Sequence, residues 1–178
     1  MERVTIGVIS GCHEIVGVTA QAGRKVNKFK AGDKVVFGCL IGSSGECDNC
    51  RGGLENYCPN LVHTYTIFLS EGDTKRYGGY SDILFMEEHF VVRILVAISL
   101  AGCAPLLCTG ITVHSPIGHF GLDRPEKHIG SMGLGGLGHV VVKFDKAFGA
   151  EVSVISASES ERQEAIEKLK ANSFIISQ

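Results

Sequence analysis

The sequence predicts an α/β protein in two parts, the first rich in β-strands and the second alternating strands with helices. Short apolar stretches with β-branched residues, separated by turn residues, fill the first hundred positions. From residue 128 onward, strand and helix patterns alternate around a glycine-rich turn. The length of 178 residues suits one ordinary domain or two small ones. We therefore expect one domain over residues 1–100 and a second over residues 101–178.

The first part is predicted to contain strands joined by turns and by one long loop. The expected strands span residues 4–10, 14–20, 34–37, 80–85 and 89–94. Residues 41–60 differ, because they are poor in apolar side chains and rich in Cys, Gly, Ser and Asn. Such a segment cannot bury a core, so we expect an exposed loop that needs another means of stabilisation.

The second part is predicted to form a parallel sheet. Residues 101–113 are apolar and continuous, as in a buried helix, and Pro116 and Pro125 bracket a polar connection. The elements that follow are expected at residues 128–132 (strand), 137–148 (helix), 151–156 (strand), 160–169 (helix) and 173–177 (strand). Right-handed crossovers make this βαβαβ order a parallel sheet. It corresponds to half of a doubly wound dinucleotide-binding domain.

Composition excludes several classes of protein. The chain is 44% hydrophobic and 20% charged, which argues against disorder, and its net charge of −2 argues against binding nucleic acid. The first ten residues lack a signal-peptide pattern, and no apolar run approaches ~20 residues, so we expect a cytoplasmic protein without a membrane span. Seven cysteines without a secretory signal favour metal ligation or free thiols over disulfides.

A glycine-rich turn follows the strand at 128–132 and opens a helix. Its residues fit the pattern G-x-G-x-x-G: Gly133, Leu134, Gly135, Gly136, Leu137 and Gly138. The first glycine allows a tight turn, the second lets the backbone approach a pyrophosphate, and the third lets the helix pack on the strand. Free amides at the helix N-terminus would then face the phosphates. The alternative is a plain turn in an α/β domain without a nucleotide.

The end of the next strand bears on which dinucleotide would bind. An NAD site places an acid there to hold the ribose 2′-hydroxyl, whereas this strand ends on Ser156 and is followed by Ser158. These hydroxyls would accommodate a 2′-phosphate, and Arg162 would supply positive charge. Glu159 and Glu161 argue against this interpretation. NADP is favoured.

Three cysteines in the polar loop have the spacing of a structural zinc site. Cys47, Cys50 and Cys58 form C-x2-C-x7-C, and zinc would supply the stabilisation that the loop lacks. Zinc normally takes four ligands, and Ser44 stands where a first cysteine would complete the pattern. Cys39 is another possible donor. The alternative is unmetallated thiols on a loose loop.

A second candidate site combines His13, Glu14 and Cys108. A catalytic zinc takes three protein ligands and keeps one open position. No further cysteine is an obvious third thiolate, because Cys12 is expected to point elsewhere on a strand and Cys103 lies on another face of the helix. The alternative is that His13 is a hydrogen-bonded structural residue and Cys108 a core residue.

Several of these motifs occur together and in order. They lie at residues 11–17 (GCHEIVG), 54–59 (LENYCP), 77–82 (YGGYSD), 104–112 (APLLCTGIT) and 133–138 (GLGGLG). In this combination the chain resembles the plant cinnamyl alcohol dehydrogenase group of zinc-dependent medium-chain dehydrogenases, which includes mannitol dehydrogenase-like members. The resemblance spans essentially the whole chain.

The resemblance implies a partial GroES-like catalytic domain followed by the first half of a Rossmann domain. It implies NADP-dependent reduction of cinnamaldehydes to cinnamyl alcohols, a step of lignin biosynthesis, in which zinc polarises the substrate oxygen. His13 and Cys108 match catalytic-zinc ligands, with Glu14 beside them, and the three loop cysteines match structural-zinc ligands. Ser156, Ser158 and Arg162 match the 2′-phosphate pocket. The implied partner is a small aldehyde or alcohol, and a full-length chain is expected to form a homodimer.

Departures from the family pattern lead to further expectations. The family's first catalytic cysteine would precede Met1, and the second half of the Rossmann domain would follow residue 178. Within the chain, Ser44 replaces a cysteine, whereas Cys12 and Lys170 replace glycines. We therefore expect this chain alone to be inactive. Mannitol dehydrogenase-like activity is an alternative, as are a truncated, non-catalytic nucleotide-binding protein and a zinc-binding regulatory module.

Overall fold

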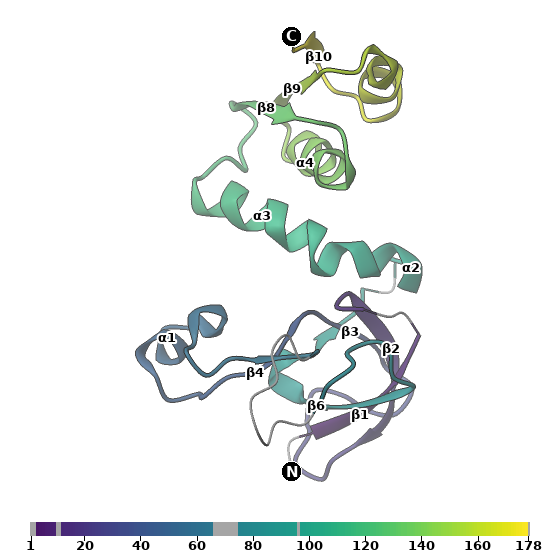
Figure 1. Ribbon diagram of the computed structural model, residues 1–178, viewed down its shortest axis with the longest axis vertical. Coiled ribbons are helices and arrows are strands. Elements are labelled where there is room, and N and C mark those ends of the chain that lie inside the picture. Colours follow the sequence, from purple (N-terminus) through teal and green to yellow (C-terminus); the bar gives the residue numbers. More distant parts are fainter. Residues whose placement is uncertain (1–2, 10–11, 66–74, 96, 178) are drawn as a thin grey trace. The chain divides into compact units, whose positions relative to one another are not determined.

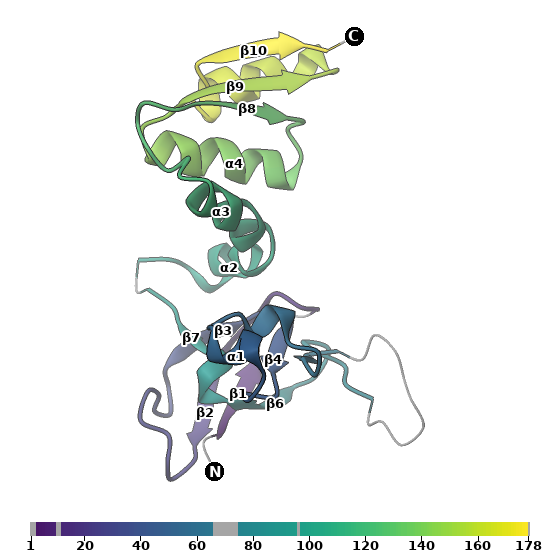
Figure 2. The same ribbon diagram turned by 90° about the vertical axis from the view of Figure 1, so that its left-hand side faces the viewer.

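The computed structural model describes residues 3–9, 12–65, 75–95 and 97–177 (Figures 1 and 2). Contacts divide the chain into two compact units, Met1–Cys108 and Thr109–Gln178. The expected domain boundary after residue 100 falls inside the first unit. This is because the short helix α2 (Leu100–Cys103) and the 3-10 helix η3 (Ala104–Leu107) pack against strands of that unit.

The main sheet of the first unit is antiparallel, with its strands in the order β6-β1-β2-β3-β7. The strands are β1 (Arg3–Val8), β2 (Ile15–Ala22), β3 (Lys34–Phe37), β6 (Ile83–Glu87) and β7 (Val92–Arg93). Alternation along β1 buries Val4 and Ile6 completely, in a core that also contains Ile15 and Phe37. This core holds together strands that are far apart in sequence, since Val4 pairs with Met86.

The predicted strands at 4–10, 14–20 and 34–37 are confirmed as β1, β2 and β3, although residue 10 lies outside the described residues. The strand predicted at 80–85 begins only at Ile83, because Tyr80 N donates to Tyr77 O and closes a turn. The strand predicted at 89–94 is shortened to β7, because the 3-10 helix η2 (Glu88–Phe90) occupies its beginning.

The cysteine-rich segment is an excursion from the main sheet. It leaves through β4 (Leu40–Gly42), passes the short helices α1 (Asp48–Arg51) and η1 (Glu55–Tyr57), and returns through β5 (Val62–His63), which pairs with β4. Within residues 41–60, all of them described, only Cys58 is buried. The excursion therefore lacks an apolar core, as its composition predicted.

The prediction of one continuous buried helix over residues 101–113 is wrong. The chain forms α2 and η3, leaves helical geometry at Cys108 (φ −122°, ψ −70°), and resumes as α3 (Thr109–His119). Pro116, predicted to begin a polar connection, lies inside α3. Proline has no amide hydrogen, so the carbonyl of Thr112 lacks its helical hydrogen-bond donor at residue 116. Thr112 is exposed, so water can take the place of that donor.

The second unit contains the predicted parallel βαβαβ arrangement. Its sheet has the strand order β10-β9-β8, formed by β8 (His128–Met132), β9 (Glu151–Ser156) and β10 (Ser173–Ile176). Helix α4 (Gly136–Ala147) packs against β8 and β9. The helix predicted at 160–169 is instead a 3-10 turn, η4 (Glu159–Glu161), followed by a π-helical segment, η5 (Glu164–Lys168).

No single helix in the described ranges is long and apolar enough to cross a membrane. The segments Leu100–Leu107 and Thr109–His119 reach the necessary length and composition only when the two are taken together.

The segment η5 ends on a non-glycine residue in the left-handed region. Lys170 has φ +63°, and Ala171 N donates to Ala165 O at 2.9 Å, which closes the end of the π-helical segment over a left-handed residue. Ala165 and Ala171 are buried in the same apolar cluster, so the turn is fixed by packing. A side chain in this conformation costs about 1 kcal/mol relative to glycine.

Lys170→Gly is therefore expected to stabilise the second unit by about 1 kcal/mol. Lys168→Gly is the matched control: it lies inside the helical segment, and we expect it to destabilise by about the same amount. Denaturant-dependent hydrogen exchange of the β9 and β10 amides measures both. Equal destabilisation by both variants would contradict the strain at Lys170.

Asp145 is the buried acid of α4. Its side chain is 0% exposed, and neither carboxylate oxygen has a hydrogen-bond partner among the described residues. Burial raises its pKa from 3.8 to about 6. Since the folded chain holds this proton more tightly than the unfolded chain, the carboxyl group lowers stability as the pH rises from about 4 to about 6.

Asp145→Asn removes this titration. The free energy of unfolding of the variant, relative to that of the original chain, is expected to rise by about 2 kcal/mol as the pH goes from 4.5 to 7.5, because the amide cannot ionise. The measurement is the free energy of unfolding of both proteins at the two pH values. Parallel pH profiles for the two proteins would show that Asp145 is not the source of the dependence.

Candidate functional site

The first candidate group is formed by His13, Glu14 and Cys108. One ligand atom from each lies within 4.8 Å of the others, and all three side chains are half-buried. His13 and Glu14 lie in the turn before β2, whereas Cys108 follows η3. An imidazole, a carboxylate and a thiol at this separation suit a zinc ion with an open position. The structure thus brings together the three residues that the sequence singled out.

Apolar packing places Cys108 beside the histidine turn. Val16 of β2 and Val36 of β3 are buried with Cys103 of α2, and Leu107 packs against the same cluster. The Leu107 carbonyl oxygen lies only 3.4 Å from where a Cβ on Gly38 would be. This packing therefore fixes the position of Cys108, the residue after Leu107.

Cys12 differs from the prediction, because it lies in a turn and not on a strand. Its backbone has φ +63°, its carbonyl accepts from Gly79 N at 2.8 Å, and its Sγ lies 3.1 Å from His13 Nδ1. The expectation that its side chain points away from His13 is therefore wrong. The left-handed turn, which strand alternation does not anticipate, brings the thiol against the imidazole.

A surface cavity of about 370 Å³ adjoins this group. It is lined by Cys12, His13, Tyr65, Arg76, Tyr77 and Tyr80. The rings of His13 and Tyr65 lie 6.2 Å apart between centroids. These tyrosines were not predicted as site residues, although two of them flank the conspicuous Gly78-Gly79 pair.

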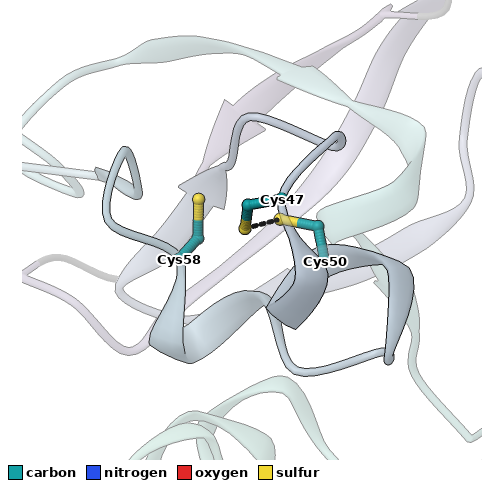
Figure 3. Close-up of side chains that lie close together, drawn as sticks. All are labelled: Cys47, Cys50 and Cys58. Atoms are coloured by element: carbon teal, nitrogen blue, oxygen red, sulfur yellow. Dashed lines mark hydrogen bonds between the residues drawn. The ribbon is translucent and has the colours of Figure 1, made fainter.

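The second candidate group is the cysteine cluster of the excursion (Figure 3). The sulfurs of Cys47, Cys50 and Cys58 lie within 4.8 Å of one another, and Cys47 Sγ is 3.4 Å from Cys50 Sγ. Helix α1 begins just after Cys47 and contains Cys50. Cys39 is exposed and is not part of this cluster in the described structure.

Hydrogen bonds favour thiolates in this cluster. The Ser43 hydroxyl is the largest influence in lowering the pKa of Cys50 to about 6, and Cys47 also contributes. The side chain and backbone amide of Ser44 lower the pKa of Cys58. Thiolates are the form that binds metals, so the donor chemistry fits a zinc ion.

The glycine loop has the backbone that the motif requires. Gly133 has φ +82°, and a Cβ on Gly138 would lie 2.1 Å from the Gly133 carbonyl oxygen. At Gly135 and Gly136, by contrast, an added Cβ would meet no other described atom within 4 Å. Leu134 is buried and Leu137 is exposed. The loop thus packs at its ends and is open at its centre.

The side chains predicted around a 2′-phosphate make other contacts. Ser156 Oγ donates to Glu161 Oε2 at 2.6 Å, and Arg162 Nη2 donates to Glu159 Oε2 at 3.0 Å. The Arg162 guanidinium also lies over the Phe174 ring, 4.8 Å from its centroid. Ser158 Oγ lies 2.7 Å from Ser160 Oγ. Glu161 and Glu159 therefore accept the hydrogen bonds of Ser156 and Arg162 that a 2′-phosphate would need.

Comparison with known proteins assigns the family. The model of the alcohol dehydrogenase GroES-like domain matches residues 2–96, more than half of the chain. The chain belongs to the zinc-dependent medium-chain alcohol dehydrogenase family. This confirms the resemblance found in the sequence.

Several plant relatives in this alcohol dehydrogenase family carry different names. The chain is 57% identical to the 8-hydroxygeraniol dehydrogenase of Catharanthus roseus, 56% to cinnamyl alcohol dehydrogenase 2 of Rauvolfia serpentina and 55% to a probable mannitol dehydrogenase of Mesembryanthemum crystallinum. Each match covers 93% of this chain and 45% or 46% of the relative. The chain spans about half the length of the curated relatives it matches.

Solved structures of alcohol dehydrogenases confirm the fold. A cinnamyl alcohol dehydrogenase from Sorghum bicolor is 42% identical, with a TM-score of 0.90. The Helicobacter pylori enzyme complexed with NADP(H) is 32% identical, with a TM-score of 0.86. Each covers 98% of this chain, which covers 56% of each. The GroES-like part followed by a parallel βαβαβ sheet is thereby confirmed.

Proposed function

We propose that this chain is part of an NADP-dependent zinc alcohol dehydrogenase that reduces cinnamaldehydes to cinnamyl alcohols in lignin biosynthesis. The observation that carries the proposal is the His13–Glu14–Cys108 group, which adjoins a cavity lined with tyrosines. In this proposal the first unit is the catalytic part and the second holds the cofactor. A mannitol dehydrogenase-like activity is the alternative within the same class.

His13 and Cys108 would hold the catalytic zinc, and Glu14 would approach it from the same turn. Bound zinc acts as a Lewis acid that polarises the substrate oxygen. The packing of η3 on β2 and β3 supports this role, because it holds the chain beside Cys108 against the strand that follows His13. Cys47, Cys50 and Cys58 would hold the structural zinc and stabilise the excursion.

The cavity beside His13 favours an aromatic substrate over a polyol. Tyr65, Tyr77 and Tyr80 line the cavity and would supply aromatic surface for packing against a flat phenyl group. Mannitol would instead need hydrogen-bond partners for many hydroxyls, because each unpaired buried hydroxyl costs free energy. The names of the plant relatives include both cinnamyl and mannitol dehydrogenases, so the substrate is the point to be tested.

The glycine loop would hold the pyrophosphate of NADP, with backbone amides of α4 facing the phosphates. The open space at Gly135 and Gly136 supports this role, as does the NADP(H) bound to the Helicobacter pylori relative. Ser156, Ser158 and Arg162 would receive the 2′-phosphate once Arg162 leaves Glu159. Glu159 and Glu161 would weaken this binding.

Two alanine substitutions separate cofactor binding from folding. Gly135→Ala is expected to keep the fold, because the added methyl group meets no protein atom, but to weaken NADP⁺ binding by on the order of tenfold or more by blocking the pyrophosphate. Gly138→Ala is expected to lower thermal stability as well, because its Cβ meets Gly133 O. Calorimetric titration with NADP⁺ and thermal unfolding measure the two effects. Unchanged NADP⁺ binding by Gly135→Ala would contradict the assignment.

A chimera tests the activity. This chain would replace the matching part of the Sorghum bicolor cinnamyl alcohol dehydrogenase, and NADPH oxidation would be followed with coniferaldehyde. We expect turnover that falls about a thousandfold in His13→Ala, because the zinc loses a ligand. His119→Ala is the matched control, since this exposed imidazole belongs to neither metal group.

Other outcomes of the chimera assay would redirect the proposal. Faster oxidation of mannitol than of coniferyl alcohol would favour the mannitol dehydrogenase-like alternative. NADPH binding without turnover of either substrate would favour a non-catalytic nucleotide-binding protein.

A further inference from the structure

The Ser44 hydroxyl lies among the sulfurs of the cysteine cluster. Its Oγ is 3.4 Å from Cys58 Sγ and 3.7 Å from Cys50 Sγ. Ser44 N also donates to Cys58 Sγ at 3.4 Å, which ties the serine backbone to the cluster. Ser44 is half-buried, as are Cys47 and Cys50.

These separations match the edges of a zinc tetrahedron. Bond lengths of about 2.3 Å for Zn–S and about 2.0 Å for Zn–O place two sulfurs about 3.8 Å apart and a sulfur and an oxygen about 3.5 Å apart. The two oxygen–sulfur distances of 3.4 and 3.7 Å bracket the second value. The Cys47–Cys50 sulfur distance of 3.4 Å is slightly shorter than the first. Ser44 Oγ thus lies at the separation expected of a fourth ligand from two of the three sulfurs.

The surroundings favour Ser44 over another protein donor at this position. Cys39, the remaining thiol considered for the site, is exposed and outside the cluster. Ser44 and Cys50 also line a surface cavity, so solvent reaches the cluster on the side where the Ser44 hydroxyl lies.

We propose that Ser44 is the fourth ligand of this site and makes it a three-thiolate, one-oxygen zinc centre. The proposal rests on zinc binding by the cysteine cluster, as proposed above. A hydroxyl is a weaker zinc donor than a thiolate and carries no charge in its usual state. The site therefore holds zinc less tightly than four thiolates would, and it releases the metal from its oxygen side.

Cobalt(II) substitution tests the donor set directly. The 178-residue chain with His13→Ala, which disables the other metal group, is titrated with Co²⁺ under reducing, oxygen-free conditions. The sulfur-to-cobalt charge-transfer band measures the number of thiolates, and the visible ligand-field band reports the mixture of donors. The same background carries Ser44→Ala, Ser44→Cys, and the matched control Ser115→Ala, which removes the hydroxyl of an exposed serine of α3, outside the cysteine excursion.

We expect three thiolates in the parent chain and four in Ser44→Cys. The ligand-field band of Ser44→Ala should differ from that of the parent chain, whereas Ser115→Ala should keep the parent band. Competition with a zinc chelator should give tighter zinc binding in Ser44→Cys than in the parent by on the order of tenfold or more, and weaker binding in Ser44→Ala.

Identical cobalt spectra and zinc affinities for the parent chain and Ser44→Ala would overturn the role of Ser44. A four-thiolate spectrum in the parent chain would also overturn it, because another cysteine would then be the fourth ligand. If only Ser44→Cys binds metal, the Ser44 inference fails while the cluster remains a metal site. If no variant binds metal, the zinc assignment itself fails.

Discussion

The packing of one apolar cluster decides where the chemistry of the first unit can be. Val16 and Val36 on neighbouring strands are buried against Cys103, and this contact brings the end of η3 back to the beginning of β2. His13 and Cys108 are far apart in the sequence, yet they come together because each borders this cluster. Loss of the packing would separate the donors without altering any of them.

Local sequence patterns predicted the elements whose burial is regular. Strand β9 was predicted with its observed bounds, and α4 within a residue. In β9 both faces are covered, as in a parallel sheet, whereas the buried residues of α4 recur with helical spacing. The C-x2-C-x7-C spacing singled out the three loop cysteines, whereas the spacing of His13, Glu14 and Cys108 is not distinctive and the family resemblance marked them as zinc ligands. The structure brings each of these two groups together. The fold class followed from the change of pattern between the two parts.

What the sequence did not predict depends on backbone geometry and on distant contacts. Cys12 has a left-handed backbone that a strand pattern cannot anticipate, and this turns its thiol toward His13. The break at Cys108 interrupts an unbroken apolar run, because the sheet and not the periodicity decides how α2 and η3 end. The contacts of Arg162 and Ser156 with glutamates depend on side-chain rotamers, which composition does not reveal.

The strand order of the main sheet also affects the rate at which the first unit assembles. Strand β1 pairs with β6, and β3 pairs with β7, so both closures wait until the whole cysteine excursion has been synthesised. Contacts between such distant segments slow folding, because a long loop must close first. An ion held by the three sulfurs would cross-link the excursion and shorten the free chain. Metal supply during translation would thus act on the speed of folding as well as on the finished protein.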